Sequence, residues 1–187
     1  MFENDPPLLD TERLRLRGWR DRDGVELARL NADARVMEFF ERPLTREESD
    51  TQLARIRAHW LECGFGCWAI EEKSGAAFVG FVGLTRPKFQ TAFTPCVEIG
   101  WRLAAEHWGQ GYATEAARAV LAHGFRKLGL AEIVSFTTVA NLRSRRVMEK
   151  IGLHRNPADD FDHPNLAMGH PLRPHVLYRL AREAWPG

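Results

Sequence analysis

The sequence has little of the features that assign a protein to a class at first sight. Its 187 residues include only three cysteines, at positions 63, 67 and 96. So small and odd a number indicates no disulfide framework and fits a reducing cytoplasm. The 26 basic residues nearly balance the 25 acidic ones, for a formal net charge of +1. Because no excess of positive charge gathers phosphates, neither nucleic acid nor a membrane surface is expected as a partner.

Longer features are missing as well. No apolar run approaches the ~20 residues that cross a bilayer, and there is no low-complexity segment, repeat or Ser/Gly-rich linker. Residues 1–5 are acidic and lack a signal-peptide pattern. With 44% apolar and 27% charged residues, the composition is that of a soluble globular protein. We therefore expect residues 1–187 to form a single cytoplasmic domain.

The cysteines and histidines do not have the spacing of a metal centre. Cys63-x-x-x-Cys67 departs from Cys-x-x-Cys, and His163, His170 and His175 depart from His-x-x-x-His. No metal is expected.

The first half of the chain predicts a strand and two helices. Residues 11–17 alternate polar and apolar side chains, as in a half-buried strand. Asp21 and Asp23 are the predicted N-cap residues of a first helix. Residues 45–48, Thr-Arg-Glu-Glu, form a capping box for a second helix, which Gly64 is expected to end.

The second half predicts a sheet followed by alternating elements. Lys127-Leu128-Gly129-Leu130 and Lys150-Ile151-Gly152-Leu153 are two similar helix ends, each with a glycine suited to positive φ. The pattern indicates an α/β (α+β) protein with a mixed sheet. The expected strands are 67–70, 78–82, 97–103, 133–139 and 175–180, and the expected helices are 113–128 and 142–151.

The most informative segment is residues 108–116, Trp-Gly-Gln-Gly-Tyr-Ala-Thr-Glu-Ala, between a strand and a helix. Its glycines allow main-chain amides to turn inward, and a helix N-terminus adds free amides and partial positive charge. Such a segment can bind a phosphate without a lysine, or it can simply be a glycine-rich turn. A P-loop is excluded because no Gly-Lys-Ser/Thr is present, and the dinucleotide pattern GxGxxG does not close a first βα unit.

This segment resembles the acetyl-CoA loop of the GNAT superfamily of N-acetyltransferases. The family pattern Arg/Gln-x-x-Gly-x-Gly/Ala is matched by Trp108-x-x-Gly111-x-Ala113, with tryptophan in place of the usual first residue. Residues 11–17 and 98–101 look like the branch that contains ribosomal-protein N-terminal acetyltransferases. A second family motif is matched by Asn141-x-x-Ser144-x-x-x-Met148-x-x-x-Gly152-Leu153.

The resemblance implies a mixed, mostly antiparallel central sheet with splayed middle strands, flanked by helices, and acetyl-CoA bound as cosubstrate in the gap. It implies that Asn141 touches the pantetheine arm, besides capping its own helix. The other cofactor-binding residues are expected to be Trp101, Arg102 and Leu103, which pair with pantetheine, together with Trp108 and the amides of Gly109, Gln110, Gly111, Tyr112, Ala113 and Thr114 at the pyrophosphate.

Two side chains are the catalytic candidates under this resemblance. Glu98 is expected to act as general base or to orient the amine, unless it is only a strand glutamate paired with Arg102. Many relatives have a tyrosine as proton donor where this chain has Met148. Ser144, one turn earlier, is the expected replacement, unless it only hydrogen-bonds within its helix. Tyr178 is a more distant candidate.

The acceptor is expected to contact residues 33–50 and the loop 155–174. In that loop Asp159, Asp160 and Asp162 are expected to attract a cationic amine, unless they are only solvated. The expected function is acetyl-CoA-dependent transfer to a primary amine, such as a protein N-terminal α-amine, by direct attack. The alternatives are an acetyltransferase of an antibiotic or metabolite amine and a non-catalytic CoA-binding sensor. The sequence does not indicate an oligomeric state or an acyl-chain preference.

Overall fold

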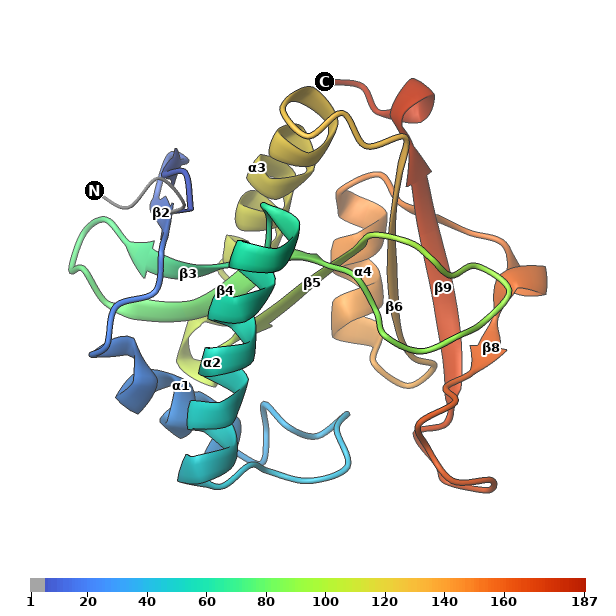
Figure 1. Ribbon diagram of the computed structural model, residues 1–187, viewed down its shortest axis with the longest axis horizontal. Helices are drawn as coiled ribbons and strands as arrows, with labels where there is room; N and C mark the ends of the chain where they lie inside the picture. The colour runs from blue at the N-terminus through green and yellow to red at the C-terminus, as the bar shows by residue number, and fades with distance from the viewer. Residues whose placement is uncertain (1–5) are drawn as a thin grey trace.

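The computed structural model describes residues 6–187, so the expectation for residues 1–5 lies outside the described residues (Figure 1). The described helices are α1 (Asp23–Ala32), α2 (Arg46–Cys63), α3 (Tyr112–Arg126) and α4 (Leu142–Lys150), with short 3-10 turns at Ala105–His107, Pro157–Asp159 and Arg182–Ala184. The strands are β1 (Leu9–Asp10), β2 (Leu14–Arg17), β3 (Cys67–Glu72), β4 (Phe78–Thr85), β5 (Glu98–Leu103), β6 (Glu132–Thr138), β7 (His154–Arg155), β8 (Phe161–Asp162) and β9 (Pro174–Ala181).

Local sequence signals set several helix ends as predicted. At the start of α2 the Thr45 hydroxyl accepts from the amide of Glu48 at 3.2 Å, and the Glu48 carboxylate accepts from the amide of Thr45 at 2.8 Å. Gly64 ends this helix with φ of 72°, and its amide donates to the carbonyl of Trp60. Gly129 and Gly152 have φ of 68° and 89° just beyond α3 and α4. The predicted capping box and the three glycine stops are confirmed.

Two predictions near the N-terminus are wrong. Residues 11–17 are not one strand, because the Thr11 hydroxyl accepts from the amide of Leu14 at 3.0 Å and closes a turn between β1 and β2. Asp21 and Asp23 do not cap α1, since residue 22 occupies the N-cap position and no side chain caps it. Asp23 is instead buried in the first turn, where it accepts from Arg17 at 2.7 Å. An ion pair with Arg17, six residues earlier, has replaced the expected cap.

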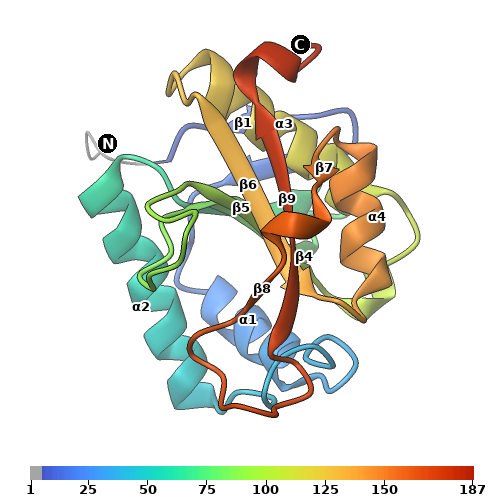
Figure 2. The same ribbon diagram turned by 90° about the vertical axis from the view of Figure 1, so that its right-hand side faces the viewer.

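The sheet has the order β1-β2-β3-β4-β5-β6-β9-β7, with β8 beside β9. Its described pairs are antiparallel except β5 with β6, which is parallel. In Figure 2, α2 lies on one side of the central strands and α4 on the other. None of the described helices is both long and apolar enough to cross a bilayer.

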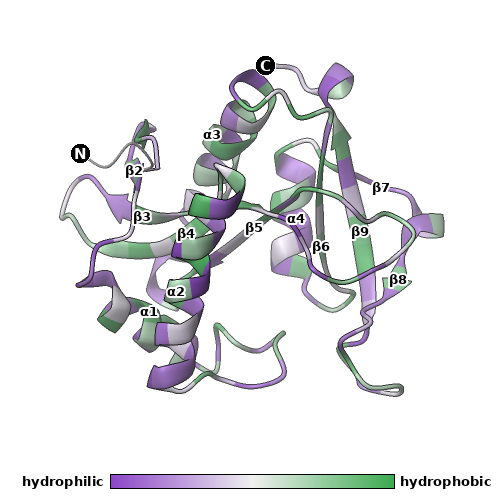
Figure 3. Cartoon of the chain, in the orientation of Figure 1, coloured by the Kyte–Doolittle hydropathy of each residue, from purple (hydrophilic) through white to green (hydrophobic). Residues whose placement is uncertain are grey.

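Side-chain alternation gives the central strands two different faces. Val82 of β4 and Ile99 of β5 belong to the core cluster that includes α3. Phe81 of β4 belongs to a second cluster with Leu27 and Leu30 of α1. Because both faces are covered, β4 is hydrophobic along most of its length (Figure 3).

The sheet opens at its centre. β4 and β5 pair at six positions, and β6 and β9 pair at seven, but β5 and β6 meet only at Glu98 and Val134. Beyond that pair the two strands diverge, as Figure 1 shows. The expected mixed, mostly antiparallel sheet with splayed middle strands and flanking helices is confirmed.

Candidate active site

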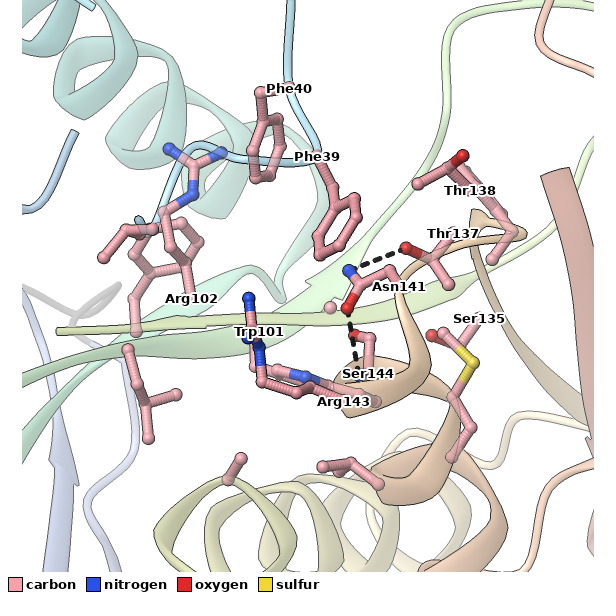
Figure 4. A pocket seen from close by; sticks show the side chains of 18 of the residues that line it. Phe39, Phe40, Trp101, Arg102, Ser135, Thr137, Thr138, Asn141, Arg143 and Ser144 are labelled. Atoms are coloured by element: carbon pink, nitrogen blue, oxygen red, sulfur yellow. Dashed lines mark hydrogen bonds between the residues drawn. The ribbon is translucent and has the colours of Figure 1, made fainter. Parts of the chain in front are cut away.

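A cleft of about 900 Å³ occupies the opening between β5 and β6 (Figure 4). Its walls come from the C-terminal half of β5, the start of α3, α4, and two segments between elements, residues 36–41 and 163–172. The predicted site residues that line it are Glu98, Trp101, Arg102, Leu103, Trp108, Gly109, Gly111, Tyr112, Ala113, Thr114, Asn141 and Ser144.

The edge of β5 that faces β6 leaves main-chain groups in the cleft. The carbonyl of Ile99 accepts from the Ser135 hydroxyl at 2.8 Å, and that of Leu103 accepts from the Trp108 indole at 2.9 Å. Successive residues of a strand point their amide and carbonyl to opposite sides, so Trp101 also faces the gap. Arg102 directs its main chain toward β4, where it is opposite Phe81. A cofactor arm running along this edge therefore meets Trp101 and Leu103 rather than the main chain of Arg102.

The glycine segment before α3 has the geometry of an anion site. Gly109 and Gly111 have φ of 76° and 82°, values that side chains disfavour. The amide of Trp108 donates to Ala105 and that of Glu115 to the carbonyl of Gly111. None of the six main-chain amides of residues 109–114 has a hydrogen-bond partner among the described residues. Six free amides at a helix N-terminus fit a pyrophosphate.

Side chains around this segment hold it in place. Arg13 donates to the carbonyl of Gln110 at 2.9 Å and pairs with Glu115 at 2.6 Å. The side chain of Gln110 donates to the carbonyl of residue 106 and does not line the cleft. The Tyr112 hydroxyl donates to Glu72 at 2.7 Å, away from the cleft. The main chain rather than the side chains of this segment is therefore available to a ligand.

The wall formed by α4 begins with an asparagine cap. Asn141 accepts from the amide of Ser144 at 3.1 Å and donates to the Thr137 hydroxyl at 3.0 Å, as Figure 4 shows. Ser144 lies beside it in the cleft lining, and Met148, 1% exposed, lies below. Tyr178 is buried outside the lining and donates to the Glu149 carboxylate at 2.9 Å. Of the two predicted proton donors, Ser144 and Tyr178, only Ser144 lines the cleft.

Glu98 lines the cleft at the start of β5. It does not pair with Arg102, whose hydrogen bond goes to Asn31. Burial raises the pKa of Glu98 to about 8, partly offset by a hydrogen bond with the Thr85 side chain, which lowers it. A carboxyl with a pKa near neutrality can exchange protons with an amine at physiological pH.

The predicted acidic attraction in the C-terminal loop is wrong. Asp159 pairs with Arg179 at 2.9 Å, Asp162 pairs with Arg173 at 3.1 Å, and Asp160 pairs with Arg155. None of the three aspartates lines the cleft. The arginines that neutralise their charge belong to no motif that the sequence indicated.

Aromatic side chains form one wall of the cleft, within the segment 33–50 where the acceptor is expected, although the sequence did not single out these two residues. Phe39 and Phe40 project into the cleft from the segment between α1 and α2 (Figure 4). Arg143 of α4 donates to Glu38 of that same segment at 2.5 Å and stacks over Trp108 at 4.5 Å, which links the two walls. The signal in the sequence was two adjacent phenylalanines in a polar segment that had no predicted element.

Within residues 6–187, no group of three His, Cys, Asp or Glu side chains is placed to hold a metal ion.

A sheet split at its centre, with free amides at a helix N-terminus beside the split, defines a class of acyl-CoA-binding transferases. The Acetyltransferase (GNAT) domain model matches residues 13–154. The chain belongs to the GNAT family, and its reaction is the transfer of an acetyl group from acetyl-CoA to an amine nitrogen.

Individual relatives agree with this assignment. The FsC-acetyl coenzyme A-N(2)-transacetylase of Aspergillus fumigatus is 33% identical over 96% of this chain and 78% of its own length. The Bacillus subtilis protein YkkB is 35% identical over 78% of this chain and 84% of its own. An acetyltransferase from Agrobacterium tumefaciens has a crystal structure that aligns with a TM-score of 0.75 at 27% identity, covering 94% of each chain.

Proposed function

We propose that the chain acetylates the α-amine of a peptide, in a complex that holds acetyl-CoA and the acceptor together, and that residues 1–187 act as one cytoplasmic unit. The observation that carries the α-amine preference is the pKa of Glu98, about 8. An α-amine has a pKa of about 7.7–8.0, so proton transfer to Glu98 is nearly balanced. A lysine amine, with a pKa of about 10.4, is a much poorer match.

The cofactor-binding roles follow from the free main-chain groups. The amides of residues 109–114 hold the pyrophosphate, because six unpartnered donors at a helix start suit its charge. The free edge of β5 at Trp101 pairs with the pantetheine arm, and Asn141 closes the other side of the gap. Bound acetyl-CoA supplies a thioester carbonyl as the electrophile.

Two side chains move the protons. Glu98 removes a proton from the acceptor ammonium, directly or through water, and the neutral nitrogen forms a bond to the thioester carbon. The carbon–sulfur bond then breaks, and the electron pair stays on sulfur. Ser144 donates its hydroxyl proton to that sulfur. The attacking nitrogen, which is positively charged once it has bonded to carbon, returns its second proton to the Ser144 oxygen through water. The products are the N-acetylated acceptor and free CoA.

The function is tested by incubating the chain with acetyl-CoA and a mixed amine panel, with products identified by mass spectrometry. The panel contains peptides beginning with Ser, Ala or Thr, the same peptides with blocked N-termini and an internal lysine, polyamines and aminoglycosides. We expect acetylated α-amines and unmodified blocked peptides. Acetylation of small amines alone would support the second candidate, a small-molecule acetyltransferase. The similarity to the FsC transacetylase along 96% of the chain favours that candidate. Acetyl-CoA binding without any product would support a sensor.

Replacing Ser144 by alanine is expected to lower kcat about tenfold and to leave the Kd for acetyl-CoA unchanged. The effect is smaller than the ~10²–10⁴ typical of an acid catalyst, because CoA thiolate leaves readily without help. Ser144→Thr, which keeps a hydroxyl, is the matched control and should retain most activity. Steady-state kinetics with both variants measure this, and a fall of less than about threefold in the alanine variant would remove Ser144 from the mechanism.

A further inference from the structure

Arg102 presents an arginine side chain to the acceptor half of the cleft with most of its donors unused. Its Nη1 donates to Asn31 Oδ1 at 2.5 Å. Its Nε is buried and has no hydrogen-bond partner, and Nη2 has none among the described residues. Buried donors are nearly always paired, so this guanidinium calls for a partner outside the protein.

Arg102 differs from Arg17 in the partners of its guanidinium group. Arg17 is fully buried and contacts two carboxylates, Asp23 at 2.7 Å and Glu71 at 2.8 Å, whereas Arg102 is half-buried. No carboxylate of the described chain acts on Arg102, and burial lowers its pKa only to about 10, so it stays charged at neutral pH. A half-buried cation with one buried donor left unpaired is stabilised by an arriving anion.

The surroundings fix the guanidinium in one position. Asn31 is itself held by donating to Ser49 at 3.1 Å and to Gln52 at 2.8 Å. The rings of Phe40 and Phe81 lie 4.1 Å and 5.4 Å from the guanidinium carbon. The fork is therefore oriented before a ligand arrives, as specific carboxylate recognition requires.

Glu98 and Arg102 stand at two ends of an open track on the same face of β5. Residues 98, 100 and 102 alternate to one side of the strand and lie opposite Thr85, Gly83 and Phe81 of β4. A side chain added at Gly100 would meet only Glu98 Oε1, at 3.9 Å. The four residue steps from Glu98 to Arg102 span about 13 Å along the strand. An extended acceptor peptide covers that distance with about three to four residues.

We propose that Arg102 binds a carboxylate of the acceptor that lies two to three residues from the reacting amine, so that the preferred acceptor is an acidic peptide N-terminus. This specificity rests on the proposed function, because Glu98 is taken to mark the amine end of the track. A free α-amino acid, whose amine and carboxylate share one carbon, is too short to reach both ends. The phenylalanines at 39 and 40 cover the intervening backbone of the peptide.

The anion at Arg102 is distinct from the phosphates of the cofactor. Arg102 of β5 and Phe81 of β4 are paired across the two strands, and their side chains lie on the sheet face that packs with α1. The six free amides start α3, which packs on the other face. An Arg102 variant is therefore expected to change acceptor selection and to leave acetyl-CoA binding unchanged.

The test compares two peptide amides, Ser-Ala-Glu-amide and Ser-Ala-Gln-amide, which differ only in the charge at the third residue. We expect kcat/KM to be about tenfold to a hundredfold higher for the acidic peptide, the range for a charge-assisted contact. Arg102→Met should remove this preference, and Arg102→Lys should restore part of it. Thermal unfolding and the Kd for acetyl-CoA show whether each variant is folded and loads its cofactor.

A binding measurement separates this inference from the proposed function. The N-acetylated forms of the two peptides cannot react, and calorimetry should show that the wild-type chain binds the acidic form more tightly and that Arg102→Met does not. Acidic preference in binding without acyl transfer to either peptide would contradict only the proposed function. Equal rates and equal affinities for the two peptides, or a preference that survives Arg102→Met, would overturn the role of Arg102.

Discussion

Replacing Gly111 by valine should raise the Kd for acetyl-CoA by roughly a hundredfold. Gly111 has φ of 82° at the N-cap of α3, a conformation that a β-branched residue strongly disfavours. The segment must rotate to relieve the strain, and several of the amides of residues 109–114 then point away from the pyrophosphate. Loss of one charge-assisted hydrogen bond, at about 1.5–3 kcal/mol, accounts for the size of the effect, since a hundredfold change in Kd is about 2.7 kcal/mol. Isothermal titration calorimetry measures it directly.

Gly64→Val is the matched control for this experiment. Gly64 also has positive φ, 72°, also lies at a helix end, and does not line the cleft. It should lose a similar amount of thermal stability and keep the wild-type Kd for acetyl-CoA. If both variants bind acetyl-CoA equally well, or both lose binding alike, the amides at Gly111 are not the pyrophosphate site.

Glu98→Gln is expected to lower kcat/KM by about 10²–10³ near pH 8, within the range of general-base contributions. The wild-type rate should rise with pH through a midpoint near 8, because only the ionised carboxylate accepts a proton and burial raises the pKa of Glu98 to about 8. The Gln variant should lack this step. The profile of the Gln variant keeps the ionisation of the acceptor amine alone, so the ratio of the two profiles isolates the step of Glu98.

A second variant tests the physical cause of the midpoint. The Thr85 hydrogen bond lowers the pKa of Glu98, so Thr85→Val should move the midpoint of the rate profile to higher pH. Glu41→Gln removes an exposed carboxyl from the mouth of the cleft and should leave the midpoint in place. A wild-type profile with no step near 8, or full activity in Glu98→Gln at all pH values, would show that Glu98 is not the base.

The same pKa has a consequence for stability. A carboxyl whose pKa is raised on folding holds its proton more tightly in the native state, so the free energy of unfolding falls as pH rises between its unfolded value and about 8. Glu98→Gln cannot ionise and escapes this loss. Thermal unfolding of the variant at pH 8 should therefore occur at a temperature no lower than that of the wild type, which also confirms that its lost activity is not lost folding.

Short-range signals in the sequence were enough to predict many of the elements. The capping box at residues 45–48, the glycine stops at Gly64, Gly129 and Gly152, and the loop before α3 depend on contacts within a few residues. The motif residues that line the cleft were expected from the resemblance to the GNAT family. Steric restriction at φ and helix-end hydrogen bonding act locally, whatever the rest of the chain does.

Other features depended on residues far apart in the chain. Asp23 lost its predicted capping role to Arg17, and the aspartates of the C-terminal loop lost theirs to arginines that neutralise them. Alternation in β5 by itself puts Glu98 and Arg102 on one face of the strand, but only the positions of β4 and α1 decide which groups surround that face. The sequence by itself determined the local elements and the amide loop. The tertiary structure alone decided where β5 leaves β6, which charges stay unpaired, and which carboxyl has its pKa raised toward neutrality, because these depend on long-range packing and desolvation.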